Sequence, residues 1–300
     1  MSDWIVSIAD TDLGAGVAMG LALFAAVMHA AFGALQKGRH DPWLTRGAID
    51  FSYGVIAIPL VFLVPWPEPD LWPVFAGMFF VHVLYKYVQG SAYQHGAYTV
   101  VYPVARGLGP LLTVLAAGMV FSESYTGVQW GGVLLLSLSI ISLSFVNWQR
   151  SKAQTESIKT ALIFAVASGV MVAAYTTYDA WGIRQATDPL TFLVWFFLID
   201  GLWVFPWLAL YRWKNMADRP APGPLLLRGL AGGIIAYLSF GSVMLATRID
   251  KVGEAAVLRE TSPIFAALIG WFILKEPVGP LRAGLMALIA LGAVFVEFGS

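Results

Sequence analysis

Apolar runs of about twenty residues recur along the whole chain and restrict its fold more than any other feature. Of the 300 residues, 58% are hydrophobic and only 12% are charged, whereas a soluble domain carries about 25% charged residues. A segment exposed to lipid must satisfy its backbone hydrogen bonds internally, so runs of this length predict helices and not strands. The chain is therefore predicted to be an all-α integral membrane protein.

Polar, glycine-rich and proline-rich breaks divide the chain into ten apolar segments. The predicted transmembrane helices are 13–36, 44–65, 71–93, 97–121, 127–147, 159–183, 190–211, 224–246, 252–274 and 280–298. At about 20 residues per crossing, they leave no length for a water-soluble domain. We expect a multi-pass protein of the inner (plasma) membrane, surrounded by the lipid bilayer.

Composition argues against several other classes of protein. The formal net charge is zero, so no charge excess indicates nucleic acid as a partner. Cysteine is absent, which excludes disulfides and thiol catalysis. The four histidines are not spaced as metal ligands on one helix, and the motifs of zinc hydrolases, serine hydrolases and P-loop proteins are missing. We expect no cofactor, metal or enzymatic activity, with an intramembrane enzyme as the alternative from another class.

An internal repeat divides the chain into two similar halves. One displacement of the sequence on itself superposes, without a gap, Arg106 on Arg259, Pro110 on Pro263, Glu123 on Glu276, Gly131 on Gly284 and Phe145 on Phe298. The predicted repeats are 1–148 and 159–300, joined by a linker at 149–158. Because each repeat has an odd number of helices, the second enters the membrane in the opposite orientation. Two inverted five-helix repeats are typical of transporters, whose binding site lies between the repeats.

Two segments resemble a known family. They read VARGLGPLLTVLAAGMVFSE from Val104 to Glu123 and VLRETSPIFAALIGWFILKEP from Val257 to Pro277, and a Gly-rich helix follows each. They resemble the two copies of the EamA-type repeat of the drug/metabolite transporter (DMT) superfamily. The resemblance covers nearly the whole chain and implies ten helices, a central cavity and a secondary carrier that works by alternating access. It also implies cytoplasmic termini, whereas the distribution of loop cations places both termini outside.

Polar residues follow one face of the predicted helix 71–93. His82, Lys86, Gln89 and Tyr93 recur at helical spacing. A charged side chain in mid-membrane costs about 2.5–3.5 kcal/mol, so this face predicts the wall of a water-filled cavity. The alternative is that Lys86 reaches the membrane surface and that the residues after it are already interfacial.

Arg106 and Arg259 occupy equivalent positions in the two halves and are the main candidates for substrate binding. A guanidinium donates two parallel hydrogen bonds to a carboxylate or phosphonate, so the pair predicts an anionic or zwitterionic substrate. Tyr102 precedes Arg106 by one turn and can contact its guanidinium. The alternative is structural, with both arginines paired to Asp50, Asp200 or carbonyls at helix ends.

Glycine and proline after Arg106 predict a loosened backbone that frees amides or carbonyls for a ligand. The residues concerned are Gly107, Gly109 and Pro110. Neighbouring residues of a helix point about 100° apart. Arg259 and Glu260 are therefore not expected to pair with each other.

Three carboxylates in the predicted helices are candidates for proton coupling: Asp200, Glu254 and Glu260. A carboxylate without a neighbouring cation in a low-dielectric region binds a proton more readily than one in water. Asp50 is different, because Arg46 one turn earlier predicts a structural ion pair within the helix. The alternative for Asp200 is an arginine from another helix.

Glycine pairs at GxxxG spacing predict close approach between helices. They are Gly16 with Gly20 and Gly127 with Gly131.

The predicted function is secondary active transport of a small anionic or zwitterionic metabolite, coupled to protons and with export favoured. An amino acid is the first expectation, followed by an organic acid or phosphonate, and a multidrug exporter for cationic compounds is the alternative. Tyr175 and Tyr237 complete the predicted lining of the cavity. A monomer and a homodimer both remain possible.

Overall fold

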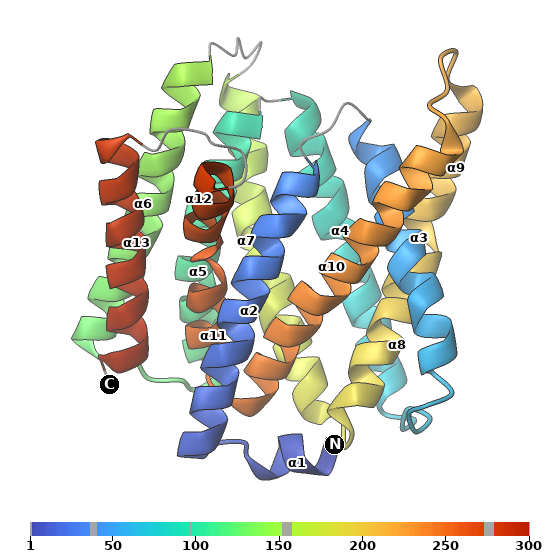
Figure 1. The fold of residues 1–300 in the computed structure, drawn as a ribbon. Helices are drawn as coiled ribbons and strands as arrows, with labels where there is room; N and C mark the ends of the chain where they lie inside the picture. The colour runs from blue at the N-terminus through green and yellow to red at the C-terminus, as the bar shows by residue number, and fades with distance from the viewer. Residues whose placement is uncertain (1, 37–40, 96–97, 152–157, 273–278, 300) are drawn as a thin grey trace. The chain divides into compact units, whose positions relative to one another are not determined.

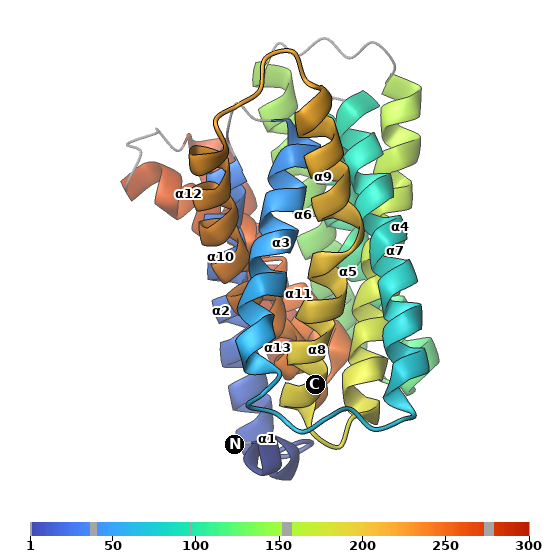
Figure 2. The same cartoon turned by 90° about the vertical axis from the view of Figure 1, so that its right-hand side faces the viewer.

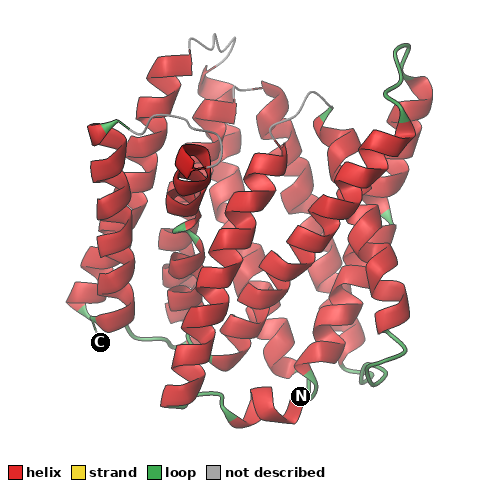
Figure 3. Ribbon diagram, in the orientation of Figure 1, coloured by secondary structure: helices red, strands yellow, loops and turns green. Residues whose placement is uncertain are grey.

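The computed structural model describes residues 2–36, 41–95, 98–151, 158–272 and 279–299 (Figure 1). All regular secondary structure in these residues is helical (Figure 3). The helices are α1 (Ser2–Ser7), α2 (Asp12–Gln36), α3 (Pro42–Leu60), α4 (Leu71–His95), α5 (Tyr98–Phe121), α6 (Gly127–Ser151), α7 (Ile158–Gln185), α8 (Pro189–Leu202), α9 (Val204–Asn215), α10 (Pro222–Ile249), α11 (Val252–Arg259), α12 (Ser262–Phe272) and α13 (Pro280–Phe298). The predicted all-α class is confirmed.

Every predicted segment contains a helix, although the helix in 44–65 ends at Leu60, and two segments are each divided into a pair of helices. The segment 190–211 divides at Trp203, and the segment 252–274 divides after Arg259. Pro206 and Pro263 follow these breaks. A proline lacks an N–H and its ring collides with the carbonyl four residues earlier, so a continuous helix cannot pass through either position without a kink.

Eight helical stretches among the described residues are long and apolar enough to cross a membrane. They include Pro189–Asn215, in which α8 and α9 count as one span. Helices α3, α11 and α12 are not among them, and the last two are only 8 and 11 residues long. The chain is therefore a multi-pass membrane protein.

The chain forms two compact units that each combine two stretches of sequence. Unit 1 contains Met1–Val83 and Asp179–Ile249, and unit 2 contains Leu84–Tyr178 and Asp250–Ser300. The divisions fall inside α4 and α7, so both helices contribute to both units. The predicted repeats divide the chain in another way, and their boundaries stay a prediction.

Helix α3 is the centre of packing in unit 1. It lies against α8 and α9 on one side (Figure 2) and against α10, which also packs on α2. Glycine allows the closest contact, because a Cβ at Gly201 of α8 would lie 2.7 Å from the carbonyl oxygen of Asp50 and from Cα of Gly54 in α3. A Cβ at Gly229 of α10 would likewise lie 2.7 Å from the carbonyl oxygen of Ala48.

Unit 2 packs α6 against α5 and α13, and α11 against α5. Gly132 of α6 faces Gly292 of α13. A Cβ on either glycine would lie 2.6 or 2.7 Å from the carbonyl oxygen of the other. Their backbones therefore meet without intervening side chains, as small residues allow in membrane helices.

The predicted GxxxG contacts are wrong for the described residues. A Cβ on any of these four glycines would have no neighbouring atom within 4 Å: Gly16, Gly20, Gly127 and Gly131. The spacing places two glycines on one face of a helix, but it does not place another helix against that face. At Gly229 and Gly233 of α10 the same spacing does accompany close contact, because an added Cβ would lie 2.7 Å from the carbonyl oxygen of Ala48 and 3.0 Å from the backbone nitrogen of Tyr53 in α3.

We expect Gly201→Ala to lower the free energy of unfolding by about 1–3 kcal/mol, because the new methyl group forces α3 and α8 apart. Gly20→Ala in α2 is the matched control. It has open space around it, so its better helix propensity leaves stability unchanged or raises it by up to about 1 kcal/mol. Thermal unfolding of both purified variants measures the difference, and equal melting temperatures would contradict the packing role of Gly201.

Candidate functional site

A helix break in unit 2 brings Arg259 and Glu260 into the protein interior. Helix α11 ends at Arg259, and α12 begins at Ser262. Pro263 has no N–H for the carbonyl of Arg259, so the hydrogen-bonding pattern of the helix cannot continue. The N–H of Glu260 lies 3.3 Å from the carbonyl of Ala256 and 3.0 Å from the carbonyl of Val257, which tightens the last turn of the helix.

Glu260 accepts hydrogen bonds from two arginines, and we name these three residues the arginine cluster. Nη1 of Arg106, from α5, lies 2.6 Å from both carboxylate oxygens of Glu260. Nε and Nη2 of Arg259 lie 3.3 Å and 3.2 Å from Oε1 of Glu260. Arg259 is 4% exposed and Glu260 is 1% exposed. Two guanidinium groups thus share one buried carboxylate.

The expectation that Arg259 and Glu260 do not pair is wrong. It assumed that both residues belong to one regular helix. Glu260 is the first residue beyond α11, with φ −75° and ψ 2°, so its side chain is free of the helical spacing and turns back to Arg259. Arg106 pairs with Glu260. The structural alternative had considered Asp50, Asp200 or carbonyls at helix ends as its partners.

Arg259 keeps donor capacity after pairing with Glu260. A guanidinium has five N–H donors, and Glu260 is the only hydrogen-bond acceptor that the described residues offer Arg259. Tyr85 and Tyr175 lie close enough to interact with its charge, and their ring centroids are 4.6 Å apart. Gln89 Nε2 donates to the hydroxyl of Tyr85 at 2.6 Å. The cluster thus presents an incompletely paired cation beside two aromatic rings.

The backbone beside Arg106 stays helical, because α5 continues from Tyr98 to Phe121 through Pro110. Pro110 has no N–H for the carbonyl of Arg106, so this carbonyl lacks its usual helical donor. The glycine after Arg106 has a packing role, because a Cβ on Gly107 would collide with the side chain of Ile141 in α6. Tyr102 belongs to α5, but its side chain lies outside the described residues.

A second buried group in unit 1, which we name the histidine cluster, joins four helices. The hydroxyl of Tyr53 (α3) donates to Oδ2 of Asp200 (α8) at 2.5 Å. His82 (α4) has Nε2 2.8 Å from Oδ2 of Asp179 (α7) and Nδ1 3.9 Å from Oδ1 of Asp200. All four side chains are buried. Asp200 therefore lies beside a phenol and an imidazole.

Sequence reasoning did not assign Tyr53 and Asp179 to a site. The available signals were weak: Tyr53 follows Asp50 by three residues, and Asp179 shares a helix face with Tyr175. His82, which was expected on a cavity wall, lies between two carboxylates. Lys86, from the same predicted face, is 3% exposed.

Unit 1 also contains the predicted ion pair of Arg46 and Asp50 and the predicted cavity residue Tyr237. Nε of Arg46 is 2.9 Å from Oδ1 of Asp50, which is 0% exposed, so these residues form an ion pair within α3. The ring of Tyr237 stacks on Phe197, with 3.9 Å between centroids. Its hydroxyl has no hydrogen-bond partner among the described residues.

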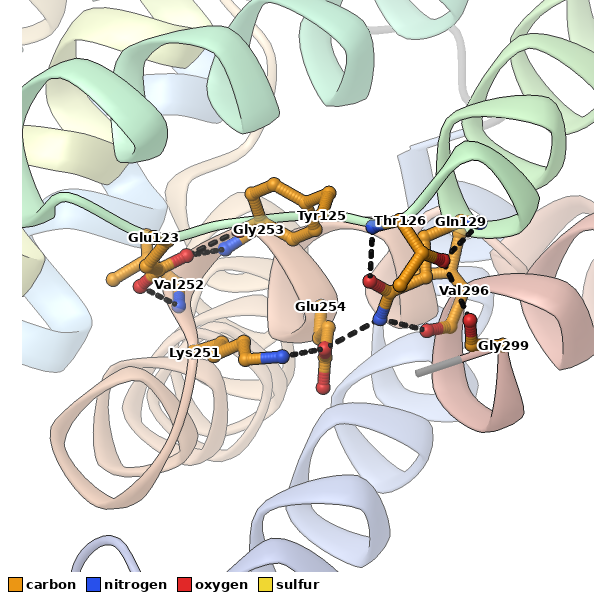
Figure 4. A network of polar contacts seen from close by, with 10 residues as sticks. All are labelled: Glu123, Tyr125, Thr126, Gln129, Lys251, Val252, Gly253, Glu254, Val296 and Gly299. Carbon is orange, nitrogen blue, oxygen red and sulfur yellow. Dashed lines mark hydrogen bonds and ion pairs between the residues drawn. The ribbon is translucent and has the colours of Figure 1, made fainter.

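The loop between α5 and α6 holds the start of α11 (Figure 4). Glu123 accepts hydrogen bonds from the N–H of Val252 at 2.7 Å and of Gly253 at 3.2 Å. A negative charge at these unpaired amides is favourable at a helix N-terminus. Tyr125 donates to Glu123, and burial together with the charge of Glu123 raises the pKa of the Tyr125 hydroxyl, which keeps it a donor.

Glu254, a candidate for proton coupling, belongs to the same network (Figure 4). Its Oε1 accepts from Lys251 Nζ at 2.8 Å and from Gln129 Nε2 at 2.9 Å, and Gln129 also donates to the carbonyl of Val296 at 2.8 Å. Burial alone would lower the pKa of Lys251. The hydrogen bond and negative charge of Glu254 outweigh burial, so the pKa of Lys251 is raised. Lys251 therefore stays charged and holds Glu254 at the first turn of α11.

Comparison with known proteins relates the second half of the chain to a family. Residues 159–298 match the model of the EamA-like transporter family, which is part of the DMT superfamily that the resemblance implied. Together with the apolar helices able to cross a membrane, this match indicates a multi-pass membrane protein similar to transporters. Among the described residues, no three His, Asp or Glu are grouped to hold a metal ion.

One solved crystal structure is similar over 94% of this chain and 95% of its own, with a TM-score of 0.74. The two sequences are 18% identical, so the similarity concerns the fold alone. No curated protein matches the sequence.

We expect Glu123→Ala to lower the free energy of unfolding by about 1–3 kcal/mol, because two amides at the start of α11 lose their acceptor inside the protein. Glu123→Gln, which keeps an acceptor oxygen but loses the charge, should have a smaller effect. Glu68→Ala, at an exposed loop position, is the control. Thermal unfolding of the three variants gives the order of their stabilities. A Glu123→Ala protein as stable as the Glu68→Ala protein would contradict the capping role.

Proposed function

We propose that this protein is an EamA-like transporter that carries a small anionic or zwitterionic metabolite, either an amino acid or an organic acid or phosphonate. The arginine cluster is the observation that supports the proposal. Two guanidinium groups share one carboxylate, and Arg259 has further donors without an acceptor among the described residues. A substrate carboxylate or phosphonate would supply the second anion and accept two parallel hydrogen bonds.

A zwitterion suits this cluster particularly well. When Arg259 turns to the substrate's acidic group, Glu260 remains bound to Arg106 and has an oxygen for the substrate's ammonium. Tyr85 and Tyr175 would provide aromatic contact for the rest of the molecule. A cationic drug finds a less suitable site here, because the only carboxylate of the cluster is already held by two arginines.

We further propose ten transmembrane helices in two inverted five-helix repeats, 1–148 and 159–300, that provide alternating access. Helices at equivalent positions of the two predicted repeats pack on each other within the units: α3 with α8 and α9, α5 with α11, and α6 with α13. A twofold relation between repeats produces such pairs, which supports the proposal. Tyr102, Tyr237 and Lys86 are proposed to line the substrate pathway.

Coupling to protons, export and a location in the inner membrane complete the proposal. Of the three candidate carboxylates, Glu260 is held by two arginines and Glu254 by Lys251 and Gln129. Asp200 contacts Tyr53 and His82, which can themselves carry or donate a proton. We therefore propose Asp200 as the carrier. Either a monomer or a homodimer is compatible with this scheme.

A thermal-shift screen tests the substrate class. Purified protein is heated with amino acids, small carboxylates, alkyl phosphonates and cationic dyes. We expect one acidic or zwitterionic class to raise the melting temperature, since a ligand at 100 times its Kd stabilises the folded state by about 2.7 kcal/mol. The shift should disappear in Arg259→Ala and weaken in Arg259→Lys, because an ammonium cannot donate two parallel hydrogen bonds.

Arg212→Ala is the matched control for this screen. It removes another arginine that is paired with a carboxylate, Asp41, at the end of α9, and it should keep the ligand-induced shift. Shifts caused only by cationic compounds, and retained in Arg259→Ala, would assign the arginines a structural role and favour multidrug export.

Proteoliposomes test the coupling, with the compound that gives the largest thermal shift as the labelled probe. We expect a pH gradient to drive its accumulation, and Asp200→Asn to reduce this accumulation at least about tenfold while retaining exchange without a gradient. Asp188→Asn, at the cap of the same helix, should behave as the wild type. Accumulation that ignores the gradient in the wild type would contradict proton coupling.

A further inference from the structure

We propose that the carbonyl oxygen of Arg259, at the break between α11 and α12, binds the ammonium group of a zwitterionic substrate. Pro263 makes this oxygen available and is therefore a positioning residue, which sets specificity without touching the substrate. The inference rests on the proposed function and deepens it. It selects amino acids and aminophosphonates over the organic acids and phosphonates that lack an ammonium group.

The hydrogen bonds at the end of α11 are unevenly distributed. The last carbonyl groups of a helix have no donor in a following turn unless the chain provides one. The N–H of Glu260 lies 3.3 Å and 3.0 Å from the two carbonyls before Leu258. The N–H and the hydroxyl of Thr261 both donate to the carbonyl of Leu258, at 3.1 Å and 2.7 Å. Among the described residues, no such donor is found for the carbonyl of Arg259.

Pro263 is the physical reason for this difference. In a continuous helix the N–H of residue 263 would donate to the carbonyl of Arg259, but proline has no N–H. The ring of a proline also collides with the carbonyl four residues earlier and turns it out of the helical direction. The next amide, that of Ile264, donates to the carbonyl of Thr261 at 2.9 Å. The carbonyl of Arg259 is thus left as an acceptor for a ligand.

This acceptor lies next to the other groups of the arginine cluster. The carbonyl of Arg259 belongs to the peptide that joins it to Glu260, and in a trans peptide the oxygen lies beside Cα of the following residue. The guanidinium of Arg259 turns back to the same glutamate, with Nη2 3.2 Å from Oε1. Donors for an acid group and acceptors for an ammonium group are therefore within reach of one small molecule that carries both, as an amino acid does.

An ammonium group matches these acceptors because it has three N–H donors and no acceptor of its own. Arg259, Glu260 and Thr261 are all buried, and a buried carbonyl that lacks a donor is destabilising. A bound amino acid satisfies this oxygen, whereas the corresponding organic acid leaves it unpaired. A site built to accept a hydrogen bond discriminates against a ligand that cannot donate one.

Matched pairs of ligands, with and without an amino group on one carbon skeleton, test the proposal. The pairs are alanine and propionate, leucine and isocaproate, aspartate and succinate, and aminomethylphosphonate and methylphosphonate. Titration calorimetry on the purified protein gives their dissociation constants. We expect the pair that binds to show at least about a tenfold preference for the amino compound, which is the effect of one hydrogen bond to a charged group. Its N-trimethyl analogue, which is charged but has no N–H, should lose this preference.

Pro263→Ala supplies an N–H at the position that would donate to the carbonyl of Arg259. We expect this variant to bind the amino compound about tenfold more weakly and its partner as before, so that the preference disappears. Pro206→Ala, after the break between α8 and α9, is the matched control. It also replaces a proline after a helix break, but far from Arg259 in the sequence, and should keep the wild-type preference.

The outcomes separate this inference from the proposed function. Equal affinity for both members of the binding pair, or a preference that persists in folded Pro263→Ala protein, would overturn the role of the carbonyl and retain an acidic substrate. Tight binding of the N-trimethyl analogue would overturn it too, because charge alone would then suffice. Binding of none of these compounds would reject the proposed function and this inference with it. If Pro263→Ala does not fold, Pro263→Gly supplies the same N–H, and if neither folds, the wild-type preference and the N-trimethyl analogue decide.

Discussion

A charged side chain among helices surrounded by lipid has no bulk water to stabilise it, so an opposite charge or a hydrogen bond must hold it in place. Glu260 meets this requirement for two arginines at once. The carboxylate stands at the end of α11, and it binds α5 to the break between α11 and α12. The hydrogen-bond donors of Arg259 that have no acceptor among the described residues are the feature from which the proposed substrate chemistry follows.

Helix α11 is held at both ends, and this positions the arginine cluster. Glu123 accepts from the first amides of the helix, and Arg106 binds the residue immediately after its last turn. Pro263 prevents the helix from continuing past that point. Glu123 and Pro263 thus determine where Arg259 and Glu260 lie, although both resemble ordinary features of a helix scaffold.

The two predicted repeats are similar in sequence but not in chemistry. Arg106 and Arg259 are equivalent positions, yet the next residue is Gly107 in one repeat and Glu260 in the other. The glycine permits close packing on α6, whereas the glutamate binds both arginines. In unit 1, Tyr53 of α3 donates to Asp200 of α8. Each cluster thus joins residues from both predicted repeats.

Length and apolar periodicity by themselves determined the helices, because the cost of an unsatisfied backbone in lipid leaves no other structure. Local spacing also related Arg46 to Asp50 within one helix. Only the tertiary structure decided that His82 lies between Asp179 and Asp200, that Arg259 turns back to Glu260, and which glycines touch. Helical periodicity defines which side chains share a face. It contains no information about which face of another helix lies opposite, and that depends on packing of the whole unit.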